Sequence, residues 1–175
     1  MKRIYSILLA LVLCILFSAQ STLASSSYVL PYPGIMPGNK LYKVSELFDS
    51  LKRYYAFGDF AQFSYNLSLS DKKLVEAKTL FEYNQYPLAL TALQKSDKYF
   101  IQAFRELKIA ASHNKDISDK RKTFMSAAQK HIEVLESVKK IVPSSFTWAD
   151  EKKAPVGLNL WAQLDTSLKI RKTYE

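Results

Sequence analysis

A cluster of prolines and glycines near the beginning of the chain separates parts of this sequence that fold differently. Residues 28–42 read Y-V-L-P-Y-P-G-I-M-P-G-N-K-L-Y and hold three of the six prolines and two of the four glycines. Each proline fixes φ at about −65° and lacks an N–H, so neither a helix nor a central strand can continue through this segment. Pro37-Gly38 suits the centre of a type II turn, and Asn39 can cap a helix that begins after it. The sequence therefore predicts a stiff, proline-rich strap over residues 25–40.

The same segment resembles the start of the mature part of a bacterial family of exported, mostly helical proteins whose biochemical role is unassigned. The resemblance covers about Val29 to Leu107, and Gly38 and Lys40 stand where family members often carry an acidic residue or a proline. Because the family has no established activity, the resemblance implies export and a helical fold but no catalytic residues. The matching positions, in the pattern L-P-Y-P-G-I-x-P followed by N-x-L-Y, are Leu30, Pro31, Tyr32, Pro33, Gly34, Ile35, Pro37, Asn39, Leu41 and Tyr42.

Residues 1–24 carry the pattern of a secretory signal peptide. Two basic residues precede an unbroken apolar run over residues 7–17, and Thr22-Leu23-Ala24 places small residues at a cleavage site. This run is shorter than the ~20 residues that a membrane span needs. We therefore expect an exported, extracytoplasmic protein, and an uncleaved segment that anchors it in the membrane is the alternative. The only cysteine, Cys14, lies in this segment, so the mature chain would have no disulfide and no thiolate metal site.

After the strap, apolar residues recur three and four positions apart, which is the spacing of amphipathic helices. Four helices are expected, at residues 41–58, 60–83, 87–113 and 116–142. Serine and aspartate residues around Ser70 leave a break in the second helix possible. The first helix carries one apolar stripe, made of Leu41, Val44, Leu47, Phe48, Leu51 and Tyr55.

Helices of similar length joined by short turns favour an all-α fold, an antiparallel bundle of four to five helices built on residues 41–142. Residues 143–175 are expected to form a linker with aromatic anchors and a C-terminal helix. The apolar face of this last helix could lie against a partner, but we expect it to close the bundle, because that arrangement also covers Phe146 and Trp148. It holds Leu160, Trp161, Leu164 and Leu168.

The sequence contains few residues and motifs that are typical of catalytic or metal-binding sites. The two histidines are His113 and His131, and no H-E-x-x-H motif, paired cysteines or glycine-rich phosphate loop is present. His113 is expected at a helix C-terminus, where a cation complements the helix dipole. His131 with Glu133 and Glu136 could form a weak surface metal site at best. We therefore expect no catalytic, cofactor-binding or metal-binding residues and no enzyme.

Aromatic residues are unusually frequent, with eleven tyrosines and ten phenylalanines. They could form a surface that stacks on sugars or grips an extended peptide. The favoured interpretation is that they are amphipathic side chains that bridge core and water at the ends of the bundle. The candidate binding surface consists of Tyr32, Tyr42, Tyr54, Tyr55, Tyr83 and Tyr86.

The chain is basic, with a formal net charge of +9, or +7 once Lys2 and Arg3 are removed with the signal peptide (9 − 2 = 7). The excess is spread along the chain, so we expect no nucleic-acid partner. The expected function is that of a non-enzymatic binding, scaffold or accessory protein of the cell envelope, with an unknown protein or envelope polymer as partner. A periplasmic stress-type chaperone or metal-responsive sensor is the alternative.

Overall fold

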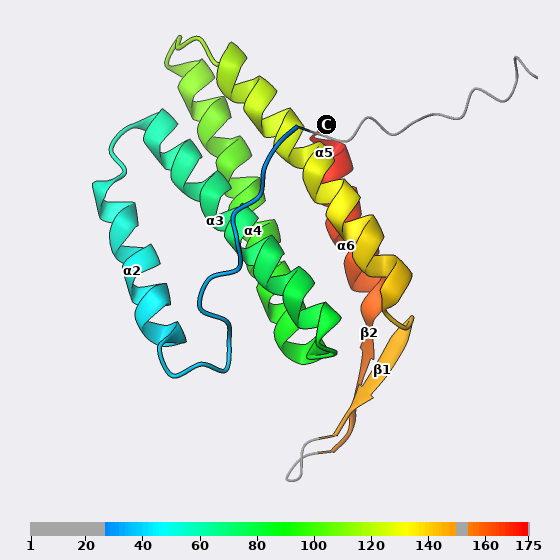
Figure 1. The fold of residues 1–175 in the computed structure, drawn as a ribbon. Coiled ribbons are helices and arrows are strands. Elements are labelled where there is room, and N and C mark those ends of the chain that lie inside the picture. The colour runs from blue at the N-terminus through cyan, green and yellow to red at the C-terminus, as the bar shows by residue number, and fades with distance from the viewer. Residues whose placement is uncertain (1–26, 150–153, 175) are drawn as a thin grey trace, which may run out of the picture.

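The computed structural model describes residues 27–149 and 154–174, so the predicted signal peptide lies outside the described residues. The described part is all-α apart from one small hairpin, and the expectation of an all-α bundle is confirmed (Figure 1). Its elements are α2 (Tyr42–Tyr55), α3 (Asp59–Glu82), α4 (Tyr86–Ser112), α5 (Ser118–Ile141), β1 (Ser145–Trp148), β2 (Val156–Asn159) and α6 (Leu160–Thr173).

Two tight turns connect the three longest helices. Asn84 between α3 and α4 has a φ of 58°, and Asn114 between α4 and α5 has a φ of 56°. Asparagine tolerates this left-handed conformation better than most residues, because its short polar side chain can bond locally. Pro87 lies in the first turn of α4, where its missing N–H costs nothing. The three helices therefore run antiparallel, with α3 and α4 in the most extensive contact.

Helix α3 runs without a break to Glu82, although the residues around Ser70 are of the kind that can interrupt a helix. The hydroxyl of Ser70 donates to the carbonyl oxygen of Ser96 on α4 at 3.0 Å. In return, the hydroxyl of Ser96 donates to the carbonyl oxygen of Ser70 at 2.9 Å. The polar residues in the middle of α3 therefore bind the neighbouring helix instead of interrupting their own.

The segment after α5 differs from the expected loop. Its two four-residue strands pair antiparallel, with Phe146 opposite Leu158 and Trp148 opposite Val156. Asn159 then caps α6 by accepting a hydrogen bond from the Ala162 amide at 3.0 Å. Helix α6 packs against α5 and α4 and completes the bundle.

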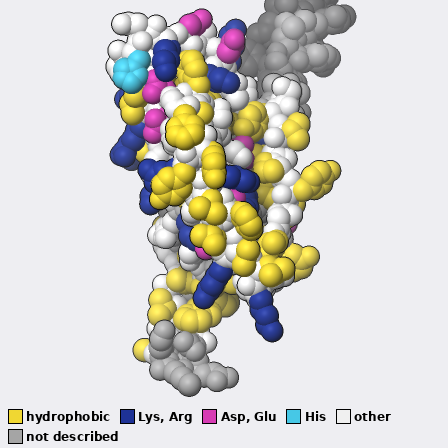
Figure 2. Space-filling view, turned by 90° about the vertical axis from the view of Figure 1, so that its left-hand side faces the viewer, with side chains coloured by type: hydrophobic (Ala, Val, Ile, Leu, Met, Phe, Trp, Pro, Cys, Tyr) yellow, Lys and Arg dark blue, Asp and Glu magenta, His cyan; other side chains and the backbone are white. Residues whose placement is uncertain are grey.

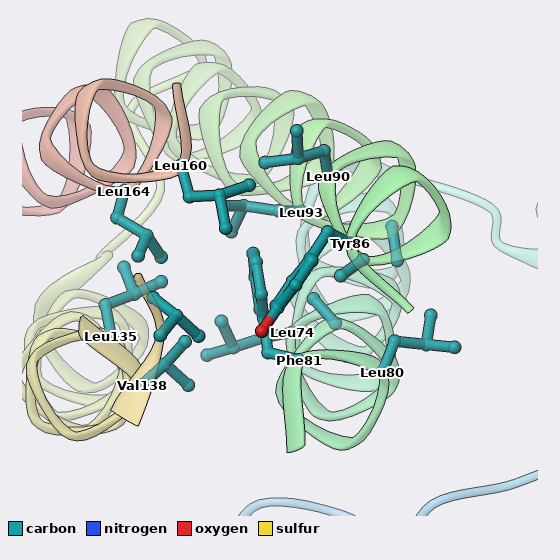
Figure 3. Close-up of a cluster of buried hydrophobic side chains, with 14 of the residues drawn as sticks. Leu74, Leu80, Phe81, Tyr86, Leu90, Leu93, Leu135, Val138, Leu160 and Leu164 are labelled. Carbon is teal, nitrogen blue, oxygen red and sulfur yellow. The ribbon is translucent and has the colours of Figure 1, made fainter. Parts of the chain in front are cut away.

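The core consists of two separate clusters of buried apolar side chains. One lies toward the β-hairpin and takes residues from α3, α4, α5 and α6 (Figure 3). Its largest members include Leu74, Phe81, Leu93, Leu135, Leu160 and Leu164. The second lies toward the other end of the bundle and includes Phe63, Leu67, Phe100, Leu107 and Phe124.

The described part of the strap, residues 27–40, runs along the outside of α3 (Figure 1). Leu30 and Met36 pack against the first cluster, and Tyr28 packs against the second. The expected turn is present: Gly38 has a φ of 98°, and the Asn39 amide donates to the Met36 carbonyl at 3.2 Å. The strap thus delivers the chain to α2, which stands at the outer edge of the molecule.

Candidate functional site

Helix α2 directs its apolar face away from the rest of the protein. The side chains on this face are between 43% and 79% exposed, whereas an amphipathic helix of a bundle normally buries them. We call this set the α2 outer face: Val44, Leu47, Phe48, Leu51, Tyr54 and Tyr55. The stripe predicted from the sequence therefore exists, but nothing in the described part of the chain covers it.

The opposite, polar face of α2 contacts α3. Nζ of Lys72 lies 2.5 Å from Oδ2 of Asp49 and donates to the hydroxyl of Ser45 at 3.1 Å. The Tyr42 hydroxyl donates to Glu76, which is fully buried, at 3.1 Å. Helix α2 is thus held by hydrogen bonds and ion pairs rather than by apolar packing.

Both acidic residues of α2 belong to this inner contact. Asp49 pairs with Lys72, and Oε1 of Glu46 lies 2.5 Å from Nζ of Lys95 on α4. Burial raises the pKa of Glu46, but the hydrogen bond from Lys95 and the nearby lysine charges outweigh it and leave that pKa below its usual value. The Glu46 carboxylate therefore stays ionised, and the carboxylates of both residues face the body of the protein.

The charges that remain beside the α2 outer face are basic. Lys43 and Lys52 flank this face and are exposed, and Lys52 touches Asp49 only at 3.9 Å. Figure 2 looks at this side of the molecule and shows a strip of hydrophobic side chains with Lys and Arg at its borders. The α2 outer face is thus an apolar strip whose two flanks on the same helix carry lysines.

The six candidate tyrosines do not form one surface. Tyr54 and Tyr55 belong to the α2 outer face, and Tyr32 is exposed in the strap. Tyr83 is exposed after the far end of α3, a helix length away from Tyr55. These positions separate the exposed tyrosines into three places.

The other two candidates require a correction, because their side chains do not project freely from the surface. Tyr86 is buried and packs its ring 4.8 Å from that of Phe146 in the core, so it does not belong to a binding surface. Tyr42 is half-buried, and its hydroxyl is held by Glu76 and Lys73. The pair on α2 lies among four other exposed apolar residues of the same helix face.

A layer of polar side chains separates the two core clusters. We call it the central polar layer; every helix of the core contributes to it, through Ser70 and Asp71, Ser96 and Asp97, His131, and Ser167 and Arg171. Nε2 of His131 lies 2.7 Å from Oδ1 of Asp71, and the hydroxyl of Tyr28 donates to the other oxygen at 2.6 Å. One carboxylate thus joins the strap, α3 and α5.

The second ion pair of this layer joins α4 and α6. The guanidinium of Arg171 binds the carboxylate of Asp97 and also donates to the Ser96 hydroxyl at 2.9 Å. Burial lowers the pKa of Arg171, and Asp97 opposes that shift. Burial likewise lowers the pKa of His131, so this ring is neutral and donates from Nε2 to Asp71. Sequence periodicity missed this layer, since it marks only which positions are apolar.

Each histidine ring has a carboxylate within hydrogen-bonding distance. His113 follows α4, as expected, and its Nδ1 lies 2.8 Å from Oδ2 of Asp59. His131 is fully buried, whereas Glu133 is exposed and paired with Lys130, so the weak metal site considered from the sequence is not assembled. Across residues 27–149 and 154–174, no three His, Cys, Asp or Glu side chains are grouped as metal ligands.

An open pocket of about 310 Å³ lies between α4, α5 and the end of α6. Phe104, Phe124 and Tyr174 form much of its wall, and Lys108 and Arg121 also line it. No carboxylate or histidine is among the described residues around it.

A protein-family model described as "Domain of unknown function (DUF5667)" matches residues 34–145. This chain belongs to the DUF5667 family. The DUF5667 match begins within the strap and ends at β1, so it includes α2 through α5 but not α6. It agrees with the expected membership of a family without assigned function and extends beyond the expected limit at Leu107. No curated protein and no solved structure matches the chain.

No helix in the described parts of this DUF5667 protein is both long and apolar enough to span a bilayer.

Proposed function

We propose that this protein is an exported, non-enzymatic accessory protein of the cell envelope that binds its partner through the α2 outer face. The observation that carries the proposal is the orientation of α2, which exposes six large apolar side chains and turns both of its carboxylates inward. Contiguous apolar patches on monomeric proteins usually mark interaction sites, because exposing them to water is unfavourable. Export is supported by the signal-peptide pattern of residues 1–24.

The non-enzymatic part of the proposal is supported by what surrounds the reactive side chains. His113 and His131 are engaged by Asp59 and Asp71, and the buried Arg171 is engaged by Asp97. Each of these contacts joins elements of the fold. They therefore serve to hold the bundle together.

The experiment compares retention of the full chain on native cell envelopes across a salt series. In the test variant, Leu47→Gln with Phe48→Gln, two residues of the α2 outer face become polar without a change in net charge. The matched control, Tyr83→Gln with Leu88→Gln, changes two exposed apolar residues at the other end of α3 and the start of α4. We expect retention of the test variant on envelopes to fall roughly tenfold or more relative to the parent chain. Retention of the control should equal that of the parent. Equal retention of both variants would refute the proposal.

A second candidate function uses the same face. An exposed apolar helix face is also what a stress-type chaperone needs to hold an unfolded client. In that case the full chain should suppress the aggregation of a heat-denatured model enzyme, and the Leu47→Gln, Phe48→Gln variant should not. A metal-responsive role predicts instead that added Zn²⁺ raises the melting temperature, because a ligand that binds the native state stabilises it.

A further inference from the structure

We infer that the occupant of the α2 outer face is a bilayer surface rich in anionic phospholipids, with α2 lying parallel to the membrane plane. This inference rests on the proposed function, because it names the partner of the same face. Three features favour this occupant: the arrangement of residues around α2, the position of its charges, and the poor fit of this face to a second copy of the chain.

The residues of α2 are arranged as in a helix that lies in a membrane interface. At ~100° per residue, the α2 outer face occupies about 120° of the helix circumference. Lys43 falls on one flank of this arc and Lys52 on the other. A helix with an apolar face and basic flanks buries the apolar side chains below the headgroups, while lysine side chains extend to the phosphates. Tyr54 and Tyr55 carry both an apolar ring and a polar hydroxyl, which suits the headgroup level.

The charges of α2 are divided between its two faces. Asp49 and Glu46 point to Lys72 and Lys95 in the body of the protein. An approaching anionic surface therefore meets Lys43 and Lys52 without opposing carboxylates from this helix. The charge of this face complements a phospholipid surface that carries negative charge.

A second copy of the chain fits this face less well. In a twofold-symmetric dimer the same patch lies on both sides of the interface, so the basic flanks of the two copies would face each other. The repulsion between Lys43 and Lys52 of the two copies would oppose the apolar contact. A lipid surface has no such conflict, and it also accepts a helix that stands at the outer edge of the protein (Figure 1).

The test uses protein-free vesicles and a signal that comes from α2 itself. Because the apolar run of residues 7–17 could bind lipid on its own, an indole is introduced by Phe48→Trp in the full chain. The parent chain, with Trp148 and Trp161, supplies the background spectrum. Vesicles contain phosphatidylcholine alone or in equal parts with phosphatidylglycerol, and brominated acyl chains act as quenchers. We expect a blue shift and quenching of the introduced indole only with the anionic vesicles.

Charge variants in the Phe48→Trp background test the flanking lysines. Lys43→Gln with Lys52→Gln should weaken binding to anionic vesicles roughly tenfold or more, since each lysine adds attraction near the surface. The control, Lys122→Gln with Lys140→Gln, removes the same charge from exposed positions on α5, on the other side of α3. This control should bind like the parent.

Three outcomes would overturn the inference. If the indole responds equally to both vesicles, or if both charge variants bind equally well, anionic lipid is not selected. If the indole stays in water with all vesicles while Leu47→Gln, Phe48→Gln still lowers retention on envelopes, the partner is a protein or polymer, and the proposed function stands. If the indole stays in water with all vesicles and the α2 substitutions also leave retention on envelopes unchanged, both proposals fail.

Discussion

Nε2 of His131 lies 2.7 Å from Oδ1 of Asp71, in the middle of the bundle and across 60 positions of sequence. The groups that face this ring come from three other helices: Asp71 from α3, Asp97 and Phe100 from α4, and Arg171 from α6. Among the residues that the structure describes, Nδ1 has no hydrogen-bond partner, so the ring has no second acceptor there for a proton gained on that nitrogen. The folded protein therefore favours neutral His131.

This environment predicts a loss of stability in mild acid. The pKa of His131 is lowered in the folded protein, so below the ordinary value of about 6.5 the unfolded chain binds a proton that the folded chain does not. Stability from this group is complete above that pH and falls by up to ~1.4 kcal/mol per pH unit below it. Thermal unfolding at a series of pH values should show a steeper decline for the parent than for His131→Gln. Parallel curves would contradict the assignment.

The strap should contribute to stability through one hydroxyl. Tyr28→Phe leaves Asp71 without a hydrogen bond from the strap, which should cost about 1–2 kcal/mol of unfolding free energy. Tyr32→Phe is the matched control, because Tyr32 lies four residues on and is exposed. It should change stability by less than about 0.5 kcal/mol. Urea unfolding of the Tyr28→Phe and Tyr32→Phe variants distinguishes these effects. Equal unfolding midpoints would mean that the hydrogen bond from Tyr28 does not stabilise the strap.

In the buried pair of Arg171 and Asp97, removal of one partner should destabilise the protein more than removal of both. Asp97→Ala leaves a buried guanidinium without its carboxylate, which should cost about 3–5 kcal/mol. Adding Arg171→Met removes the unpaired charge and should restore most of that loss. Asp165→Ala, which breaks an exposed pair with Lys139, is the control and should cost at most ~1 kcal/mol. A double variant no more stable than Asp97→Ala would refute this account.

Helix α2 should open separately from the rest of the bundle. Lys72→Ala removes the ion pair with Asp49 and the hydrogen bond to Ser45, so amide hydrogen exchange within residues 42–55 should accelerate. Exchange in α4 and α5 should not change, because their cores do not include α2. Lys78→Ala, which breaks only an exposed pair with Glu82, serves as the control. Uniform acceleration across all helices would show that α2 is part of one cooperative unit.

Much of the helical architecture could be predicted from local patterns. The helices expected at 60–83, 87–113 and 116–142 are present as α3, α4 and α5, with ends shifted by a few residues. Apolar periodicity identified their bodies, and Asn84, Pro87 and Asn114 identified their ends. These signals act over a few residues and are therefore readable from one sequence.

The β-hairpin and the orientation of α2 could not be predicted in the same way. Strands of four residues, such as Ser145–Trp148, are too short to show an alternating pattern. Periodicity revealed the apolar stripe of α2, but not whether another element covers it. That outcome depends on Lys72 and Lys95, which come from later helices and draw Asp49 and Glu46 inward.

The central polar layer fixes the axial alignment of the helices. Sliding α5 by one turn, about 5.4 Å, would move His131 from Asp71 toward the leucines or phenylalanines of a neighbouring cluster. The same displacement of α6 would bury Arg171 without Asp97, at a cost that apolar contacts do not offset. Purely apolar helices tolerate such slippage, because one leucine replaces another. A bundle with this layer replaced by leucine and methionine should therefore be harder to unfold, yet less certain to fold into a single arrangement.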